Sequence, residues 1–464
     1  MTDFETTPSQ PLLGVPIGRE AALDTWTAMA EEICPVDPSL YVEYNVNRGL
    51  RDQTGKGVLA GLTSIGNVLG NAVEGDQLVP APGQLLYRGI EVTDLVNGFV
   101  AGGQHGFEET AYLLLFGSLP TASQLTDFDH YLSGMRRMPR SFVHDGILRM
   151  PSRDIMNAMM RGVLGLYTLD PEGSNTSTRN VLRQSLHLTA KLPMLAVYAY
   201  QAYLDEFCKK SLVIHHPEPE CSTAENFLHM LRPNSDFSKL ESQILDMMLV
   251  LHAEHGGGNN STFTTRVVSS TGTDTYSAIA ASLGSLKGPR HGGANLKVVE
   301  MLDDLEATIT DFEDDEQIAD YIHRLLNKDA YDNAGLVYGM GHAVYSVSDP
   351  RTVVLRGYAE ELARVKGYSE VFELHKRVER IAPLIISAQR RVYKGVSANV
   401  DFYSGFVYRM LDIPSELYTP LFAISRVVGW SAHRLEELAN GGKIIRPAYK
   451  SVSPSQEYIP LADR

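Results

Sequence analysis

The sequence predicts an all-α protein with a few short strands near the N-terminus. Residues 236–251 show the clearest helical pattern. Ser238 and Glu241 form a capping box, and apolar side chains then follow at helical spacing over a wide arc. A helix with such a wide apolar face is expected to be buried. Strand patterns are short and early, at 57–65 and 84–90.

Helical periodicity recurs through the rest of the chain. No internal repeat or low-complexity tract interrupts it, and the acidic stretch 303–317 is expected to be solvated surface. A helical chain of 464 residues is expected to form a large helical body with a smaller helical lobe. The pattern predicts helices over 106–116, 122–137, 178–204, 315–327, 352–365, 368–393 and 414–439.

Composition narrows the class of function. A net charge of −15 argues against nucleic-acid binding, and an anionic ligand would need a local group of arginines. The three cysteines are widely spaced, which favours a reducing compartment over a disulfide framework. The N-terminus has no apolar core of a signal peptide, and no apolar run is long enough to span a bilayer. We therefore expect a soluble, cytoplasmic protein.

The stretch "LHAEHGGGNNSTFTTR" (251–266) carries two histidines three residues apart. The pair is a weak metal signal, since a third ligand is not evident, and we expect no metal. For His252 we expect a positively charged imidazolium that caps the end of its helix. His255 lies directly before three glycines, so that a ligand contact is at least as well supported there.

The stretch "GSLKGPRHGGAN" (284–295) surrounds His291 with residues that turn the backbone. The turn leads into a helix that begins near Ala294. The positive end of a helix dipole keeps a nearby imidazole neutral, and a neutral imidazole can donate a hydrogen bond to a developing enolate. The alternative is a histidine that only caps the helix.

The stretch "GLVYGMGHAVYSVSDPRTVVL" (335–355) contains another histidine in a glycine-rich turn. Gly339 and Gly341 flank Met340 and precede His342, but the spacing is not that of a dinucleotide-binding loop.

A helix start follows in the same stretch. Asp349 is the expected N-cap, with Pro350 at the first helical position and Arg351 at the second. An arginine beside a helix N-terminus is suited to bind a carboxylate. The alternative for Arg351 is a surface ion pair with acidic side chains of its own helix.

Three more charged residues lie in apolar surroundings toward the C-terminus. Asp401, in "ANVDFYSGFVYRML" (398–411), is either satisfied by backbone N–H groups or desolvated as a general base. Arg426 lies in the apolar "LFAISRVVGW", where a buried arginine needs an anionic partner. Arg446 lies in "KIIRPAY", near the end of the chain.

These stretches together resemble the citrate synthase family. The resemblance runs from "QLLYRGI" to "IIRPAY" and rests on five motifs in family order. The motifs are "LHAEHGGGN", "GPRHGGAN", "GHAVYSVSDPR", "NVDFYSG" and "SRVVG".

The resemblance implies a two-domain helical fold and a homodimer. The large domain is expected to comprise residues 1–293 and 411–464, and the small domain residues 294–410. The implied enzyme is an acyltransferase that condenses acetyl-CoA with oxaloacetate and water to give citrate and CoA. Neither a cofactor nor a metal is implied, and neither nucleic acid nor a membrane is an expected partner.

The resemblance also assigns roles to residues. His291 is expected to stabilise the enol of acetyl-CoA, Asp401 to remove the methyl proton, and His342 to polarise the oxaloacetate carbonyl. Binding of the oxaloacetate carboxylates is implied for His255, Arg351 and Arg426, with Arg446 contributed across the dimer interface. CoA contacts are implied for Tyr338, Gly339, Met340, Gly341 and Arg290.

Three positions depart from the family pattern. Ser346 stands where a basic residue often binds CoA phosphate, and Ala398 stands where proline is common. Arg290 replaces a common leucine and could compensate for the missing phosphate contact. The N-terminal β-domain of some NADH-inhibited members has no counterpart, so we expect no NADH site of that kind.

Two other functions compete with this one. A 2-methylcitrate synthase uses propionyl-CoA on the same fold, and one methylene in an apolar pocket discriminates by only about 1–3 kcal/mol. A non-catalytic sensor of carboxylates or CoA is the second rival. Asp401 argues against the sensor, because binding two anionic ligands gives no reason to keep a carboxylate there.

Overall fold

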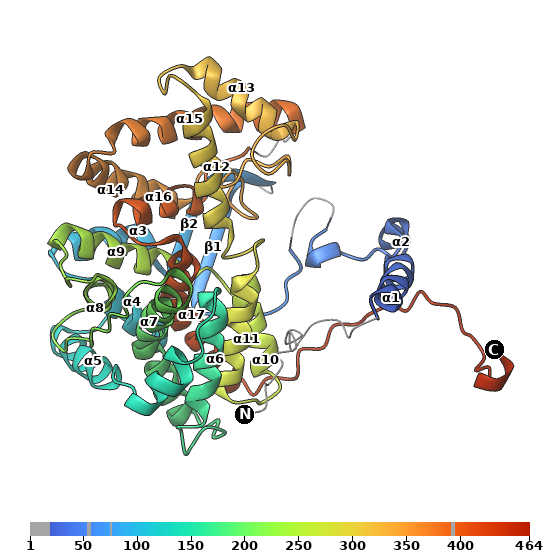
Figure 1. Ribbon diagram of the computed structural model, residues 1–464, viewed down its shortest axis with the longest axis horizontal. Coiled ribbons are helices and arrows are strands. Elements are labelled where there is room, and N and C mark those ends of the chain that lie inside the picture. Colours follow the sequence, from blue (N-terminus) through green and yellow to red (C-terminus); the bar gives the residue numbers. More distant parts are fainter. Residues whose placement is uncertain (1–18, 53–56, 75–76, 391–394) are drawn as a thin grey trace, which may run out of the picture. The chain divides into compact units, whose positions relative to one another are not determined.

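The computed structural model describes residues 19–52, 57–74, 77–390 and 395–464. Contacts divide the chain into an N-terminal unit that ends at Ala60 and a helical body over Gly61–Arg464. Helices dominate both units, and the all-α prediction is confirmed (Figure 1). None of the described helices is long and apolar enough to cross a membrane.

The N-terminal unit contains helices that the sequence analysis did not predict. They are α1 (Glu20–Ile33), α2 (Pro38–Glu43) and a 3-10 turn at Arg48–Leu50. Neither helix buries a side chain within the described unit. Their apolar residues therefore face no core. A prediction from periodicity assumes that one face of a helix packs against a core.

The helical body begins with a hairpin of β1 (Gly66–Glu74) and β2 (Gln77–Tyr87), to which the short β3 (Ile90–Glu91) pairs. The predicted strand 57–65 is wrong: only Gly57 forms an isolated bridge, and Leu59 and Leu62 are exposed. The predicted strand 84–90 is broken, because Arg88 and Gly89 both have positive φ and form a two-residue turn between β2 and β3.

The body is otherwise helical. A π-helix at Phe142–Leu148 and 3-10 turns at Ser415–Leu417 and Leu461–Asp463 connect longer elements. The helices are α3 (Val92–Ala101), α4 (Phe107–Phe116), α5 (Ala122–Met135), α6 (Ile155–Tyr167), α7 (Thr178–Cys208), α8 (Thr223–Leu231), α9 (Lys239–His252), α10 (Asn260–Ser269), α11 (Thr275–Lys287), α12 (Ala294–Thr308), α13 (Asp315–Leu326), α14 (Pro350–Lys366), α15 (Ser369–Arg390), α16 (Asp401–Met410) and α17 (Tyr418–Ala439).

Every helix predicted from periodicity is present, with ends that move by a few residues. The predicted 368–393 is α15, and its last residues lie outside the described range; the predicted 414–439 is a 3-10 turn followed by α17. The capping box of Ser238 and Glu241 is confirmed at the start of α9. Helices α3, α6, α8, α10, α11 and α16 were not predicted, although α6 and α11 are longer than the predicted α4 and α13.

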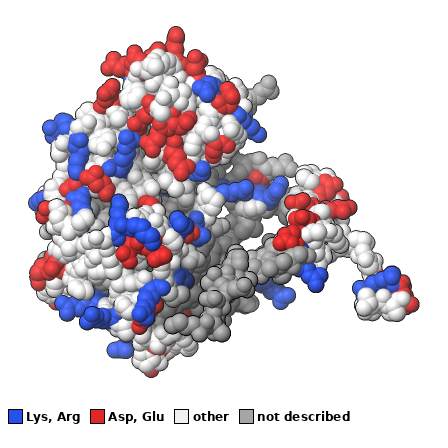
Figure 2. All heavy atoms as spheres, viewed as in Figure 1, with Lys and Arg blue, Asp and Glu red and all other residues white. Residues whose placement is uncertain are grey.

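Two long helices form the centre of the body. α7 and α17 pack against each other, and most of their side chains are buried on all faces. α12 to α16 pack mainly against one another and form a second group of helices. In Figure 1 the hairpin lies between the two groups, and β2 contacts α14. Figure 2 shows acidic side chains gathered where α13 lies, so the acidic stretch is surface as predicted.

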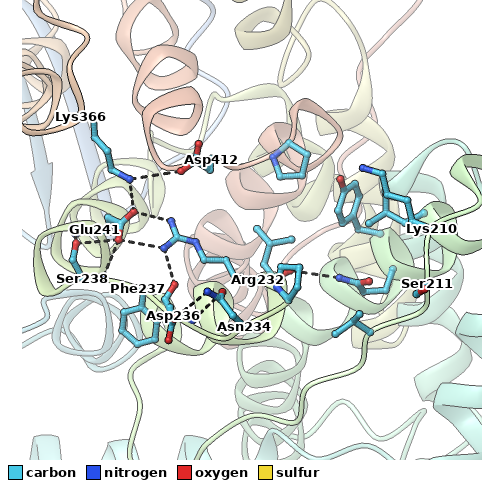
Figure 3. Close-up of a pocket in the computed structure, with 17 residues that line it drawn as sticks. Lys210, Ser211, Arg232, Asn234, Asp236, Phe237, Ser238, Glu241, Lys366 and Asp412 are labelled. Atoms are coloured by element: carbon cyan, nitrogen blue, oxygen red, sulfur yellow. Dashed lines mark hydrogen bonds and ion pairs between the residues drawn. The ribbon is translucent and has the colours of Figure 1, made fainter.

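A cavity of about 850 Å³ lies where α9 meets the end of α14 and the start of the chain that leads to α17 (Figure 3). Four of its charged groups bind one another. Arg232 and Lys366 both reach the buried Glu241, at 2.8 and 2.7 Å, and Arg232 also donates to the Leu411 carbonyl. Lys366 lies 3.6 Å from Asp412 as well. These ion pairs therefore join segments that are far apart in sequence. None of the predicted catalytic residues lines the cavity.

Candidate active site

The segment after α9 carries both predicted histidines into the interior. His252 ends α9 and is buried, with Nδ1 2.8 Å from the Met248 carbonyl. Burial, with the charges of Arg351 and Arg426, lowers the pKa of His252 to about 3 although the Met248 carbonyl opposes this shift. The expected charged cap is therefore wrong, because a buried imidazole beside two guanidinium groups stays neutral.

His255 lies three residues on and faces the other predicted site residues. Its ring centroid is 5.1 Å from that of His342 and 5.7 Å from that of Tyr345. Burial, followed by the charges of Arg351, His342 and Arg426, holds its pKa well below the ordinary value. Among the described residues nothing hydrogen-bonds to its buried Nε2. This nitrogen is positioned to bind a ligand.

Arg426 projects from α17 toward the same place and is completely buried. Its Nε donates to the His252 carbonyl at 2.5 Å, which leaves two terminal nitrogens without a hydrogen-bond partner in the described chain. Its guanidinium lies over the Phe422 ring, 4.7 Å from the centroid. A buried guanidinium with two unpaired nitrogens is poised to bind an anion.

Arg351 begins α14, with Asp349 as N-cap and Pro350 at the first position as predicted. Its Nε and one terminal nitrogen bind both oxygens of Asp349, at 3.0 and 2.7 Å. An ion pair with an acidic residue of the same helix is present, because Asp349 is the N-cap of α14. The expected surface location is wrong, since both residues are buried. Asp349 orients this guanidinium and keeps it charged, although burial alone would lower the Arg351 pKa.

Two loops join to bring His342 and Asp401 together. Gly341 N donates to the Ser397 carbonyl at 2.7 Å, and Asn399 N donates to the Gly339 carbonyl at 2.9 Å. The Asn399 side chain also binds the Gly341 carbonyl, at 3.0 Å. Both glycines have positive φ, which a side chain would strain.

His342 is oriented by the backbone that follows it. Its Nδ1 accepts the N–H groups of Val344 and Tyr345, at 3.0 and 3.1 Å. The ring also stacks on the Tyr345 ring at 4.5 Å between centroids. Because Nδ1 is an acceptor, the ring proton lies on Nε2, and that nitrogen can donate to a carbonyl oxygen.

Asp401 is the first residue of α16. Its backbone N–H binds the Asn399 side chain at 3.0 Å, whereas its buried Oδ1 has no hydrogen-bond partner in the described chain. Burial raises the pKa of Asp401 to about 6, against the opposing charges of Arg351 and Arg426. Of the two alternatives that the sequence left open, these contacts favour the desolvated base.

His291 lies in the turn before α12, whose N-cap is Gly293. Burial, aided by the charge of Arg426, lowers its pKa to about 4, and the predicted neutral imidazole is confirmed. Burial rather than the helix dipole is the main cause. Its Nε2 is 3.0 Å from Ser261 Oγ, which also accepts from Trp430 Nε1 at 3.2 Å.

The residues expected at CoA are less uniform. Arg290 is exposed beside His291, and Met340 pairs with Ala398 across the two joined loops. The Tyr338 hydroxyl binds Asp332 at 2.7 Å. These positions border the site, and nothing in their contacts selects a particular ligand.

Arg446 is the last of the predicted residues in the chain. It is exposed in the segment that follows α17. The neighbouring Ile445 N–H binds Ser270 Oγ, at the end of α10.

The candidate residues for catalysis and carboxylate binding, other than Arg446, act on one another electrostatically. Arg351, His342, Arg426 and His291 all lower the pKa of His255, and the two arginines also lower that of Asp401. The fold thus gathers residues from five separate segments around two buried cations and one carboxylate.

Comparison with known proteins agrees with this geometry. Residues 53–448 match the family described as Citrate synthase, C-terminal domain.

The chain belongs to the citrate synthase family.

Its curated relatives in this family carry two names. A citrate synthase of Acidithiobacillus ferridurans is 34% identical over 88% of this chain and 97% of the relative. A 2-methylcitrate synthase of Shewanella oneidensis is 34% identical over 82% of this chain and 92% of the relative. The sequence resemblance is confirmed, together with the ambiguity between the two acyl groups.

Solved structures of citrate synthases share the fold. The enzyme of Thermoplasma acidophilum, described as a ternary complex with carboxymethyl coenzyme A and oxaloacetate, has a TM-score of 0.73 at 28% identity. The alignment covers 90% of this chain and 99% of that one. The enzyme of Pyrobaculum aerophilum gives a TM-score of 0.71 at 28% identity, over 88% of this chain and 94% of that one.

Sequence reasoning missed the residues that hold the site together. Ser261 and Trp430 fix the His291 ring, and Asn399 joins the two loops. Ser261 and Asn399 lie inside stretches that the sequence analysis examined, but their types are common in turns and gave no separate signal.

Proposed function

We propose that this chain condenses acetyl-CoA with oxaloacetate and water to give citrate and CoA. One observation carries the proposal. A carboxylate with a pKa near 6, Asp401, lies in a buried site that also holds two guanidinium groups and neutral histidines. That combination suits removal of a proton from carbon beside a bound dianion.

In the first step Asp401 takes a proton from the acetyl methyl group. A thioester methyl is a weak acid, so the enolate oxygen must be stabilised as the proton leaves. His291 is the donor in our assignment. Because Nε2 faces Ser261, the Nδ1–H group donates a hydrogen bond to the enolate oxygen, and the Ser261 hydroxyl donates one to Nε2.

In the second step the enol carbon attacks the oxaloacetate carbonyl. The Nε2 proton of His342 polarises this carbonyl, in keeping with Nδ1 as an acceptor. Arg351, Arg426 and His255 hold the two carboxylates. Arg426 has two unpaired nitrogens for this purpose, and Asp349 holds Arg351 in place. Water then hydrolyses the citryl thioester and releases CoA.

We assign CoA to the edge of the site that carries Tyr338, Gly339, Met340, Gly341 and Arg290. Arg290 is exposed and adjacent to His291 in the chain, which suits contact with phosphate. We infer that neither a metal nor a redox cofactor takes part, because each step above has a protein group to perform it.

Propionyl-CoA is the second candidate substrate, since relatives of similar identity carry both names. Steady-state kinetics with oxaloacetate and each thioester test the choice. We expect kcat/KM for acetyl-CoA to exceed that for propionyl-CoA by about tenfold, the effect of one methylene. A preference for propionyl-CoA would make the chain a 2-methylcitrate synthase.

We propose that residues 294–410 form a small domain that closes over a large domain of 1–293 and 411–464. The mutual packing of α12 to α16 supports this division. His255 and Arg426 then belong to the large domain, and His342 and Arg351 to the small one. A dianion that binds both domains favours the closed state and excludes water from the enolate.

Replacing Asp401 with asparagine tests the assignment of the base. Asp401→Asn should lower kcat by at least about a hundredfold, because the loss of a general base typically costs 10²–10⁴-fold. Oxaloacetate affinity, measured by calorimetry, should change by less than about threefold because Asp401 does not bind that ligand in our assignment. Activity within tenfold of wild type would reject Asp401 as the base.

The pH profile gives an independent reading of the same group. Burial raises the pKa of Asp401 to about 6, and only the ionised carboxylate accepts a proton. The kcat/KM for acetyl-CoA should therefore fall tenfold per pH unit below about pH 6. A flat profile down to pH 4.5, with folding verified by circular dichroism, would contradict a desolvated carboxylate base.

Arg446 generates a prediction about assembly. Its exposure supports a homodimer in which it completes the partner's site. Arg446→Leu and Asp401→Asn homodimers should both be inactive. After subunit exchange, mixed dimers should recover activity because one of their two sites has both residues intact. Confirmed exchange without recovered activity would contradict a shared site.

A further inference from the structure

Glu254 lies between His252 and His255 and has no part in the mechanism above. It is completely buried, at 0% exposure. Its Oε1 binds His433 Nε2 at 2.9 Å and the backbone N–H of Gly256 at 2.5 Å. This one oxygen thus spans the backbone turn that carries His255.

His433 is held in one orientation from its other side. Arg266 Nε and one of its terminal nitrogens donate to His433 Nδ1, at 3.1 and 2.7 Å. The ring proton therefore lies on Nε2 and is donated to Glu254. Arg266 is itself held by Glu436 and Glu437. The Glu254 carboxylate is the inner end of a chain of buried polar contacts.

Two glycines bring backbone close to the Glu254 side chain. A Cβ at Gly66, at the start of β1, would lie 2.8 Å from Oε1, and one at Gly429 would lie 2.5 Å from Oε2. The carboxylate is therefore clamped between β1 and α17. It has no room to take another rotamer without moving one of these elements.

α17 presents three residues to this segment from one face. Arg426, Gly429 and His433 follow at helical spacing, three and four residues apart. Arg426 binds the His252 carbonyl, Gly429 admits the Glu254 carboxylate, and His433 binds it. The same helix that carries Arg426 thus fixes the position of His255 relative to it.

The surroundings of Glu254 also keep its carboxylate ionised. Burial alone would raise its pKa, but His433, Arg426 and the Gly256 N–H outweigh burial and hold it below the ordinary value. Burial lowers the pKa of Arg426 to about 10, and Glu254 is the foremost neighbour that opposes this fall.

We infer that Glu254 is a positioning residue for the proposed oxaloacetate subsite, which fixes the His255 turn against α17 through His433. The inference rests on the proposed function. Glu254 acts through its oxygen as a hydrogen-bond acceptor, which holds the His255 turn in place. Its negative charge does not help to bind oxaloacetate, because like charges repel.

Two substitutions separate these roles. Glu254→Ala removes the acceptor and should raise KM for oxaloacetate at least about tenfold, the loss of a buried hydrogen bond to a charged group. KM for acetyl-CoA should stay within about threefold, because His291 and Asp401 are held by other contacts. Glu254→Gln keeps an oxygen for His433 and Gly256, and both KM values should stay within about threefold of wild type.

Control variants guard against general loss of structure. Glu108→Ala removes another buried carboxylate, which binds the Thr223 N–H, and should leave both KM values unchanged. Gly66→Ala displaces the carboxylate while keeping its charge, because the nearest atoms to its Cβ all belong to the Glu254 side chain, and it replaces Glu254→Ala if that variant does not fold. It should give the same rise in KM for oxaloacetate.

The outcomes are separate for this inference and for the proposed function. Equal losses in Glu254→Ala and Glu254→Gln would overturn the inference, because charge and not position would then matter. An unchanged KM for oxaloacetate in both Glu254→Ala and Gly66→Ala would overturn it too. A wild-type chain that forms no citrate or methylcitrate would instead reject the proposed function.

Discussion

The buried guanidinium of Arg426 is the constraint on which the site depends. It is completely inside the protein, yet only its Nε has a hydrogen-bond partner in the described chain. A buried charge without partners is costly, so the surrounding fold must hold it in place. α17 does so, because its side chains are buried on nearly every face and it packs along α7.

The other features of the site follow from this cation and from Arg351. Burial, aided by the charges of these two guanidinium groups, keeps the nearby histidines uncharged, which leaves them as hydrogen-bond donors and acceptors rather than acids. Asp401 lies near both cations but is buried deeply enough for its pKa to rise to about 6. The protein is acidic overall, with a net charge of −15, so an anion is attracted by this interior pair and not by the exterior.

Local signals in the sequence predicted local structure well. The capping box of Ser238 and Glu241 and the start of α14 at Pro350 are as expected, because each depends on neighbours in the chain. The strand at 57–65 failed because Val58, Leu59 and Leu62 are exposed, and only Ile65 at its end is buried in the core. The charge expected on His252 failed because the imidazole is buried and two arginines from distant segments lie beside it, and no local pattern reports either cause.

Contacts between distant segments account for most of what the sequence could not supply. The motifs identified His291, His342 and Asp401 as candidates. No local pattern shows how Ser261 and Asn399 hold these candidates or how Glu254 holds His255, since each makes its contact across a gap of 30 or more residues. A residue such as Glu254 is recognised only when its partner His433 is known.

The most direct measurement is calorimetric titration of oxaloacetate into the wild type, Arg426→Leu and Arg434→Leu. Arg434 is equally buried on α17, but Thr275, Ser269 and the Thr273 carbonyl satisfy its guanidinium. Arg426→Leu should weaken binding by about 10- to 150-fold, the value of a hydrogen bond to a charged group, and Arg434→Leu should lower the unfolding midpoint without changing affinity. Unchanged affinity in Arg426→Leu, or equal losses in both variants, would contradict the claim that the unpaired guanidinium binds the dianion.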